Sequence, residues 1–342
     1  MKKTKRNLII GIILIIMTGV VVMFSRSSRV TITESGAIYD CAGRTIQGVT
    51  VRADHVTVQN CIMDGWFGTG ITTYGQDNLF ENIIINNGKC EGNPCDKDGI
   101  RFFGSGHIFK NITINLGTCS APSHCDGAQT HGESAASNVT FDGMEINNMC
   151  VYFDSSDVNY KCQGFMIENV AHDIVIRNSV INAYRAVNIG DSRFPAPNNI
   201  TVVNNTIVGE IPPPAPSVEE WGVFVTKGTN VVVKNNIFYD VAGEHLKGSI
   251  DATNNLVYRS DGGRLYDPRF ISDLWSVDPL FIDPANRNYH LSVNSPARGK
   301  ADDGSDLGAF QFGAPLTDML SVTPMLTSLL GKIPSAQEEK KN

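Results

Sequence analysis

Apolar and polar residues alternate in seven segments along the chain, at 55–63, 78–85, 107–114, 138–146, 173–181, 199–207 and 230–238. Alternation at period two is typical of short β-strands with one buried face. Most of these segments carry Asn after the first strand, at Asn60, Asn82, Asn111, Asn178, Asn204 and Asn235, and Gly143 takes this place once. Both residue types tolerate left-handed backbone, so the position predicts a tight bend. The Asn side chains can hydrogen-bond to one another between successive repeats.

A second alternating phrase follows each of the first six segments after a gap of variable length, at 70–75, 99–104, 127–132, 164–169, 186–191 and 222–227. Each repeat therefore contains two strands joined by the Asn bend, a variable loop and a third strand. Short strands repeated in this way predict a solenoid with a continuous core. The predicted fold is all-β, a single-stranded right-handed parallel β-helix, because parallel connections are almost always right-handed. A β-sandwich is the alternative, but it would not place Asn at matching phase in each repeat.

The N-terminus predicts a signal anchor. Residues 8–24 contain no charged residue and follow a basic end, and no small-residue cleavage site comes after Phe24. We expect a single-pass transmembrane helix with the body outside the cytoplasm, or a secreted body if the N-terminus is cleaved. The predicted domains are 1–28 for the basic end and anchor, 29–313 for the β-helix, and 314–342 for a tail that could form a capping helix.

The charge balance restricts the partners of the body. Five of the 28 basic residues and none of the 35 acidic residues lie in 1–26, so the remainder has 23 basic residues minus 35 acidic ones, a net charge of −12. Such a body repels phosphate backbones, which argues against nucleic acid as a partner. An anionic polysaccharide would need a local basic patch or a bridging cation. We expect a monomer.

The cysteines indicate an oxidising compartment, since their spacing does not form the paired knuckles of a zinc site. We expect a Cys41–Cys61 disulfide between the first coils and a Cys150–Cys162 disulfide. Two more are expected among Cys90, Cys95, Cys119 and Cys125, with the pairing open. The alternative is that several are buried thiols.

The Asn-bend repeats, the variable loops before the third strands and the C-terminal DPLF, YHLS, SPA and DLGAF segments resemble the pectate-lyase-like β-helix superfamily over residues 36–313. The resemblance implies the fold and a substrate groove along the third strands. It does not imply one activity, because this superfamily includes lyases, hydrolases, epimerases and proteins without enzymatic activity. The hydrolase motifs and a clear calcium motif of the lyases are absent from the sequence. Site residues must therefore be predicted from the stacking of the coils.

Stacking the third strands predicts columns of outward side chains about 4.8 Å apart. Asp98 and Asp126 precede equivalent glycines in successive coils, so we expect their carboxylates to lie within about 5 Å or slightly more. Such a pair could share a proton for acid–base catalysis, could hold Ca²⁺, or could be neutralised by Arg101. The alternative is that each Asp is a turn residue. No cofactor other than Ca²⁺ is expected.

The residues around this pair complete the predicted site. The further catalytic candidates are His124 and His131 as acid or base and Arg185 as a stabiliser of an enolate-like charge. The substrate-binding candidates are Arg101, Gln129, Lys161, Glu168, Asn188 and Trp221. Trp221 could stack on a sugar or could simply cover a loop.

These patterns predict a membrane-anchored extracytoplasmic protein that is active on a polysaccharide or cell-surface glycan, as a polysaccharide lyase or a glycoside hydrolase. The alternative is a β-helix that binds glycans or surface partners without catalysis. An open groove at the Asp98–Asp126 cluster would favour the enzyme, and a covered face would favour the binding protein.

Overall fold

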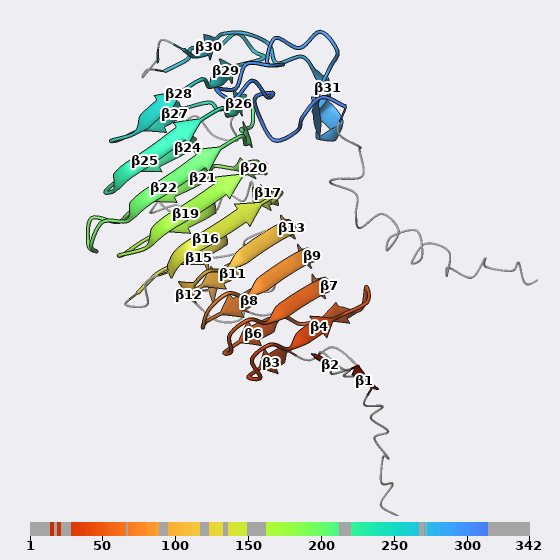
Figure 1. Ribbon diagram of the computed structural model, residues 1–342. Coiled ribbons are helices and arrows are strands. Elements are labelled where there is room, and N and C mark those ends of the chain that lie inside the picture. Colours follow the sequence, from red (N-terminus) through yellow and green to blue (C-terminus); the bar gives the residue numbers. More distant parts are fainter. Residues whose placement is uncertain are drawn as a thin grey trace, which may run out of the picture.

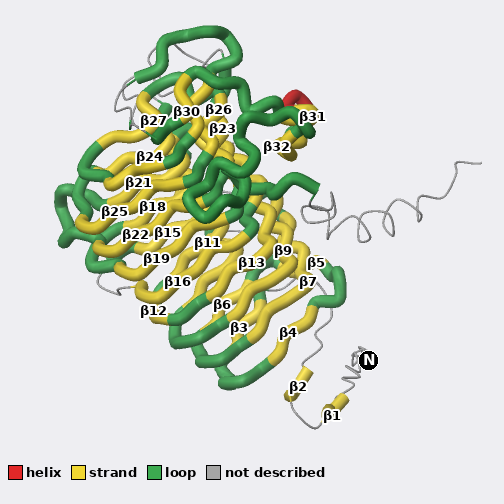
Figure 2. The backbone as a smooth tube through the Cα atoms, turned by 45° about the horizontal axis from the view of Figure 1, so that its top comes forward, coloured by secondary structure: helices red, strands yellow, loops and turns green. Residues whose placement is uncertain are grey.

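The computed structural model describes residues 14–16, 19–21, 29–65, 68–88, 95–116, 123–132, 136–148, 162–211, 220–266, 270 and 272–313. Its body is a stack of parallel β-coils that runs from β3 at one end to β30 at the other (Figure 1). Turning the molecule shows the strands following one another around each coil (Figure 2). The predicted all-β parallel β-helix is therefore confirmed.

The third strands of the coils form a nine-stranded parallel sheet. Its strands are β3 (Val30–Ile32), β6 (Val49–Val51), β8 (Thr69–Thr73), β11 (Asp98–Phe102), β15 (Asp126–Thr130), β18 (Gln163–Ile167), β21 (Arg185–Ile189), β24 (Trp221–Val225) and β27 (Glu244–Lys247). Each strand pairs with its equivalent in the next coil, so residues at the same position stack into columns.

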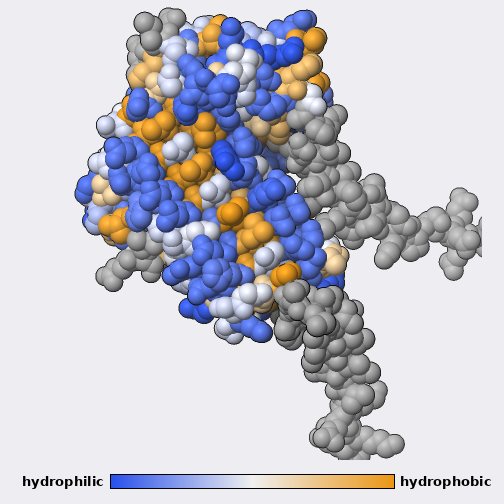
Figure 3. Space-filling model, viewed as in Figure 1, coloured by the Kyte–Doolittle hydropathy of each residue, from blue (hydrophilic) through white to orange (hydrophobic). Residues whose placement is uncertain are grey.

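The first two strands of the coils form a 17-stranded sheet. It contains β4 (Ile38–Asp40), β5 (Thr45–Ile46), β7 (Thr57–Asp64), β9 (Leu79–Asn86), β12 (Gly104–Ser105), β13 (Ile108–Asn115), β16 (Ala136–Asp142), β17 (Glu145–Asn148), β19 (His172–Arg177), β20 (Val180–Ala183), β22 (Asn198–Val203), β23 (Thr206–Val208), β25 (Thr229–Lys234), β26 (Ile237–Tyr239), β28 (Asp251–Thr253), β29 (Leu256–Tyr258) and β30 (Leu274–Trp275). Figure 3 shows the molecule from the same side as Figure 1, with apolar patches among polar side chains on the surface.

The bend between the first two strands is built as predicted. Asn60, Asn82, Asn111, Asn178, Asn204, Asn235 and Gly143 all have left-handed backbone, with φ from 52° to 68°. In the first coils the bend side chains form the predicted ladder, because Asn82 donates to Asn60 at 3.5 Å and Asn111 donates to Asn82 at 3.4 Å.

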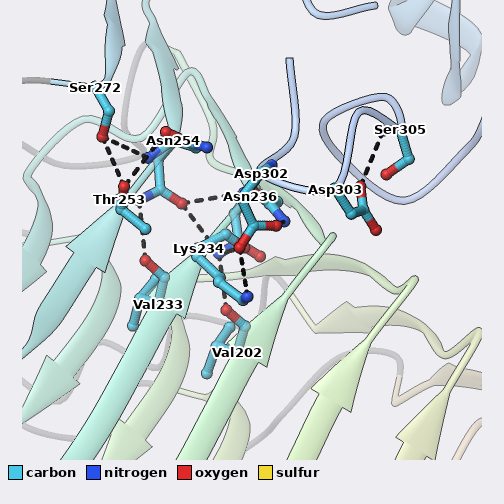
Figure 4. A network of polar contacts seen from close by, with 12 residues as sticks. Val202, Val233, Lys234, Asn236, Thr253, Asn254, Ser272, Asp302, Asp303 and Ser305 are labelled. Carbon is cyan, nitrogen blue, oxygen red and sulfur yellow. Dashed lines mark hydrogen bonds and ion pairs between the residues drawn. The ribbon is translucent and has the colours of Figure 1, made fainter. Parts of the chain in front are cut away.

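A second and fully buried Asn ladder was not predicted. Asn205, Asn236 and Asn255 follow the bend residues in three later coils, and their side chains point into the coil interior. Asn236 donates to the carbonyl of Val202 at 2.9 Å (Figure 4). It also donates to Asn255 Oδ1 at 3.1 Å. Repeated side-chain bonds of this kind satisfy backbone groups at the corner, where the strand ladder is interrupted.

The core is a continuous cluster of apolar side chains that stack from coil to coil. Phe80, Phe109 and Phe141 occupy one position in three successive coils, with ring centroids 4.9 Å and 4.8 Å apart. At the C-terminal end, Leu265, Phe270 and Trp275 pack against this core.

The chain after Trp275 turns back along the side of the coils instead. A short antiparallel pair, β31 (Phe281–Asp283) and β32 (Asn288–Leu291), flanks the 3-10 helix η1 (Pro284–Asn286). Tyr289 and Phe310 pack on the outer face of Val180 and Val208.

At the N-terminus, β1 (Leu14–Ile16) pairs antiparallel with β2 (Gly19–Val21). Among the residues described, no helix combines the length and the apolar character that crossing a membrane requires. The rest of 1–28 and the predicted tail 314–342 lie outside the described residues.

Candidate functional site

The predicted columns lie on the outer face of the nine-stranded sheet. Asp98 pairs with Thr69, and Gln163 pairs with Asp126 on one side and Arg185 on the other. Arg101 pairs with Gln129, which places Asp98 beside Asp126 in the neighbouring strand. The stacking order of this part of the sheet is thus as predicted from the sequence.

A glycine at the start of the third strands explains why the preceding side chain can point outward. At Gly99, a Cβ would lie 2.6 Å from the carbonyl oxygen of Gly127 and 2.8 Å from Cγ2 of Ile114. Backbone at this corner therefore lies against the core, where only glycine fits without displacement.

Asp98 and Arg101 form a buried ion pair. Asp98 is 0% exposed, and its Oδ2 accepts from Nε of Arg101 at 2.6 Å. Its Oδ1 accepts from the backbone N–H of Asp126 at 3.0 Å. Of the predicted ways to neutralise the Asp98–Asp126 pair, these contacts favour Arg101.

Both oxygens of Asp98 accept hydrogen bonds. The possible Ca²⁺ site at Asp98 and Asp126 stays a prediction. Among the residues described, no group of three or more His, Cys, Asp or Glu side chains is arranged to hold a metal ion.

The polar network continues along the sheet through two amides. Gln163 Nε2 donates to Oδ1 of Asp126 at 3.2 Å, and Nδ2 of Asn188 donates to Oε1 of Gln163 at 2.5 Å. Asn188 was a predicted site residue. Gln163 was not, although its place before Gly164 put it in the same column as Asp98 and Asp126.

The centre of this face is covered. Every residue of β15 and β18 is buried, including the outward residues Gln129 and Met166. Asp126 is 1% exposed. Both carboxylates of the Asp98–Asp126 cluster are thus covered, whereas the condition that favoured catalysis there was an open groove.

The remaining candidates near the centre are only partly described. His131 packs edge-on against Phe103, with centroids 5.4 Å apart, and Phe103 stacks on Tyr74 at 5.2 Å. Glu168 is buried and follows β18. His124 lies in the two-residue strand β14 (Ser123–His124), which pairs with β10 (Cys95–Asp96), and its side chain is outside the described residues. Lys161 also lies outside them.

A cluster of cations and aromatic rings occupies the C-terminal half of the same face. The guanidinium carbon of Arg185 lies 4.3 Å from the ring centroid of Trp221, and Nζ of Lys247 lies 5.2 Å from it. Trp221 also packs against Phe224, with centroids 4.3 Å apart. Trp221 is only 9% exposed, so this geometry does not favour the predicted sugar-stacking role.

Lys247 and its ion-pair partner Glu244 were missed in the sequence. They belong to β27, which aligns Glu244 with Trp221 and Lys247 with Phe224. The short alternation of apolar and polar residues after Gly243 could have indicated this strand, but the segment lacks the full alternating pattern of the other third strands.

Glu220 is a buried carboxyl group immediately before Trp221. Its oxygens accept from the backbone N–H groups of Glu210 at 2.9 Å in its own coil and of Ala242 at 2.6 Å in the next coil, which joins two successive coils at one corner. Burial raises the pKa of Glu220 to about 7, an effect that the two N–H groups only partly offset.

Of the predicted disulfides, the Cys41–Cys61 bridge is confirmed. Cys41 and Cys61 form a disulfide across the first coils. Cys125 is disulfide-bonded. Cys162 is buried, and its expected partner Cys150 lies outside the described residues, as do Cys90 and Cys119. The pairings of these cysteines stay predictions.

Comparison with known proteins supports the fold. No protein-family description matches the sequence, and no curated protein matches it. Among solved structures, pectate lyase Pel9A is similar with a TM-score of 0.53 and 16% identity over 86% of each chain. An alginate lyase from Paenibacillus sp. str. FPU-7 gives a TM-score of 0.38 and 14% identity, over 72% of this chain and 91% of the lyase. At such identities the likeness concerns the fold alone, and this chain shares the parallel β-helix of Pel9A.

Proposed function

We propose that this protein acts on a polysaccharide that lies along the outer face of the nine-stranded sheet, as a polysaccharide lyase or a glycoside hydrolase. One observation carries the proposal. Ionic and aromatic side chains from successive coils gather on this face, from the Arg101–Asp98 pair to the Arg185–Trp221–Lys247 cluster. A sheet with a repeat in each coil presents side chains at regular intervals, which suits a ligand that also repeats.

The fold adds support of a weaker kind. Pel9A is a pectate lyase on a similar scaffold, but a shared fold is compatible with many activities. Burial of the Asp98–Arg101 pair is a further indication. Charged groups that are withdrawn from water cost folding free energy, and such groups are often retained at functional sites.

The two enzymatic alternatives differ in what they need from the cations. In β-elimination a base removes the proton next to a uronate carboxylate, and the C4–O4 bond breaks to give an unsaturated sugar. Arg185 would stabilise the enolate-like charge that develops on that carboxylate. Hydrolysis needs a protonated acid and a second carboxylate, which would have to come from Asp98 and Asp126.

Glycan binding without catalysis is the second candidate. The closed centre of the face favours it, because Asp98 is 0% exposed and Asp126 is 1% exposed. A ligand would then contact the partly exposed cation and aromatic cluster without reaching either carboxylate.

The proposed location outside the cytoplasm rests on the sequence of residues 1–26 and on the disulfide chemistry. If the N-terminus is an anchor, fractionated cells should hold the full-length chain in the membrane fraction. Soluble protein that begins between Ser25 and Val30 would show cleavage instead.

The test is to incubate the full chain in detergent with a panel of acidic and neutral polysaccharides, with and without Ca²⁺. Unsaturated products would be followed by ultraviolet absorbance and new reducing ends by a chemical assay. Both signals together indicate a lyase, and reducing ends alone indicate a hydrolase. Binding to a polysaccharide without either signal would support the non-catalytic candidate, and absence of binding to every polymer would refute the proposal.

A further inference from the structure

Four apolar side chains are exposed on the C-terminal segment, at Leu280, Ile282, Val293 and Phe312, and we call them the C-terminal patch. They are 40% to 63% exposed, and they make up four of the seven exposed large apolar side chains among the residues described. Apolar side chains that gather on a surface usually mark a binding place. Leu280 is a second indication, because its φ of 52° is a left-handed conformation that Asn or Gly would adopt at lower cost.

Hydrogen bonding between β31 and β32 places three of these residues beside one another. The N–H of Ser292 donates to the carbonyl of Leu280 at 3.0 Å, and Val293 follows Ser292 directly. Ile282 lies two residues after Leu280, and the ring of Phe281 between them packs inward against β26. Leu280, Ile282 and Val293 therefore form one continuous part of the surface.

Arg298 connects this part to Phe312. Its Nη1 donates to the carbonyl of Val293, and its guanidinium carbon lies 3.8 Å from the ring centroid of Phe312. Among the residues described, no carboxylate pairs with Arg298, and its buried Nε has no hydrogen-bond partner. A guanidinium that is partly withdrawn from water favours a carboxylate as its partner. The patch therefore fits an apolar segment that contains an acidic residue.

The sequence that follows the patch has this character. Residues 316–330 read LTDMLSVTPMLTSLL, with eight Leu, Met or Val residues and one charged residue, Asp318. Asp318 comes five residues after Gly313, where the described part of the chain ends. Five residues can span up to about 17 Å, which is enough for the carboxylate to reach Arg298. So short a connection gives an effective concentration on the order of 1 mM, so even weak docking is populated.

We propose that residues 316–330 dock on the C-terminal patch, with Asp318 as the ion-pair partner of Arg298. The covalent connection favours this segment over a second copy of the chain, which would compete only at a concentration on the order of 1 mM. The docked segment covers the outer side of β31 and β32 and helps to hold them on the coils.

The first test uses a carbodiimide, which joins an amine to a carboxylate where the two are in contact. In the full chain in lipid nanodiscs, Arg298→Lys should give a crosslink to Asp318 within one chain, identified by mass spectrometry of the digested protein. Lys300 is the matched control, since it is exposed and lies two residues away, and it should give little of this product. A crosslink between two chains, or equal yields from position 298 and from Lys300, would overturn the inference.

The second test measures hydrogen exchange of the backbone amides of residues 316–330 in the same nanodiscs. Docking should slow this exchange at least about tenfold relative to a free peptide of the same sequence. Ile282→Ser should reduce the protection about fivefold, because an apolar contact is lost. Arg298→Gln and Asp318→Asn should each reduce it about threefold, as expected for a partly exposed ion pair, and Lys300→Gln should leave it unchanged.

Melting temperatures identify a variant whose body fails to fold, and Asp318→Asn, which lies outside that body, decides the matter in that case. Exchange throughout 316–330 as fast as in the free peptide would overturn the inference. Protection that rises with protein concentration would also overturn it, in favour of a second copy. Protection that Ile282→Ser and Asp318→Asn both leave unchanged would place the segment elsewhere, for example on the lipid, with the same consequence.

Discussion

At the scale of single residues, the corner before each third strand determines which chemistry the outer face can carry. Gly99 lies close to Gly127 and Ile114 at this corner, and Arg101 donates to the neighbouring Asp98. The carboxylate and the guanidinium are therefore held together by local backbone geometry. This explains why a buried ion pair forms between residues only three positions apart on one strand.

The Asp98–Arg101 pair can be tested by a double-mutant cycle. Asp98→Asn should lower the free energy of unfolding by about 2 to 3 kcal/mol, because it removes the carboxylate that accepts from the partly buried guanidinium of Arg101. Arg101→Met should lower the free energy of unfolding by a similar amount, because it removes the positive charge beside the buried carboxylate of Asp98. Chemical denaturation of both single variants and of the double variant should give a coupling free energy of at least about 1 kcal/mol, and simple additivity would contradict the pairing.

Asp126→Asn separates a catalytic role from a structural one. The side chain is buried and accepts from Gln163, and an Asn can keep that contact through its Oδ1. We expect a loss of stability of about 1 kcal/mol. If Asp126 is catalytic, cleavage of the polysaccharide identified in the panel should also disappear, and a folded, fully active variant would remove this residue from the site.

Glu220 predicts a pH dependence of stability. Its pKa is raised from 4.5 to about 7 by burial, so the folded state binds the proton more tightly than the unfolded state. Glu220 therefore contributes stability that is fully present below pH 4.5 and is lost as the pH rises through about 7. The change can reach about 3 kcal/mol.

Glu220→Gln mimics the protonated form and should remove this part of the pH dependence. Denaturation between pH 4 and pH 8 should give a flatter profile for the variant. Glu210 and Arg259 both interact with this carboxyl group. Asp261→Asn, which changes the ion pair of Arg259 at the surface, serves as a control that should retain the slope of the wild type.

At the scale of the elements, hydrogen bonds between equivalent side chains join one coil to the next. The bend ladder lies partly at the surface, whereas Asn205, Asn236 and Asn255 are 0% exposed and bond to backbone on both sides. A buried amide with several partners fixes the register of neighbouring coils, because a slip of one residue would leave its donors unsatisfied.

Asn236→Ala should lower the free energy of unfolding by about 2 to 3 kcal/mol, since it removes bonds to Val202, Lys234 and Asn255 inside the coil. Asn198→Ala is the matched control, because Asn198 is exposed and bonds only with Thr229 and Asn230 among the contacts described. Its effect should stay near 0.5 kcal/mol. Equal losses in urea titrations of the two variants would argue against a structural role of the buried ladder.

At the scale of the whole molecule, the C-terminal segment from Leu265 to Asp302 covers the end of the core and contacts the side of the coils. Leu265 and Trp275 cover the last coil, and Asp302 then reaches back to Lys234 at 2.6 Å and to Asn235 at 2.7 Å. The two contacts hold residues far apart in sequence. They connect the end of the chain to coils that would otherwise expose an apolar wall.

A chain that ends at Asp278 should expose the outer faces of Val180, Val208 and Ile237, which the segment 280–310 covers. We expect a lower melting temperature and binding of an apolar dye, in comparison with a chain that ends at Gly313. Light scattering should show whether the exposed wall also promotes association. If both chains behave alike, the segment does not contribute to the stability of the coils.

The sequence by itself determined the repeat. Period-two alternation and the left-handed preference of Asn and Gly are local properties, so the strands, the bends at residues such as Asn60 and Asn235, and the stacking of Asp98 on Asp126 could all be predicted. Even the Cys41–Cys61 disulfide followed from the length of one coil.

Only the tertiary structure decided the rest, because burial and partners depend on what packs against each position. Stacking brings Asp98 and Asp126 together but does not reveal that both are covered, or that Arg101 neutralises one of them. Trp221 was correctly placed in its column, yet its cation partner Lys247 belongs to a coil whose strand lacks the repeat phrase. The alternation that forms the strands is a property of neighbouring residues. The environment of a side chain depends instead on residues that are distant in the sequence.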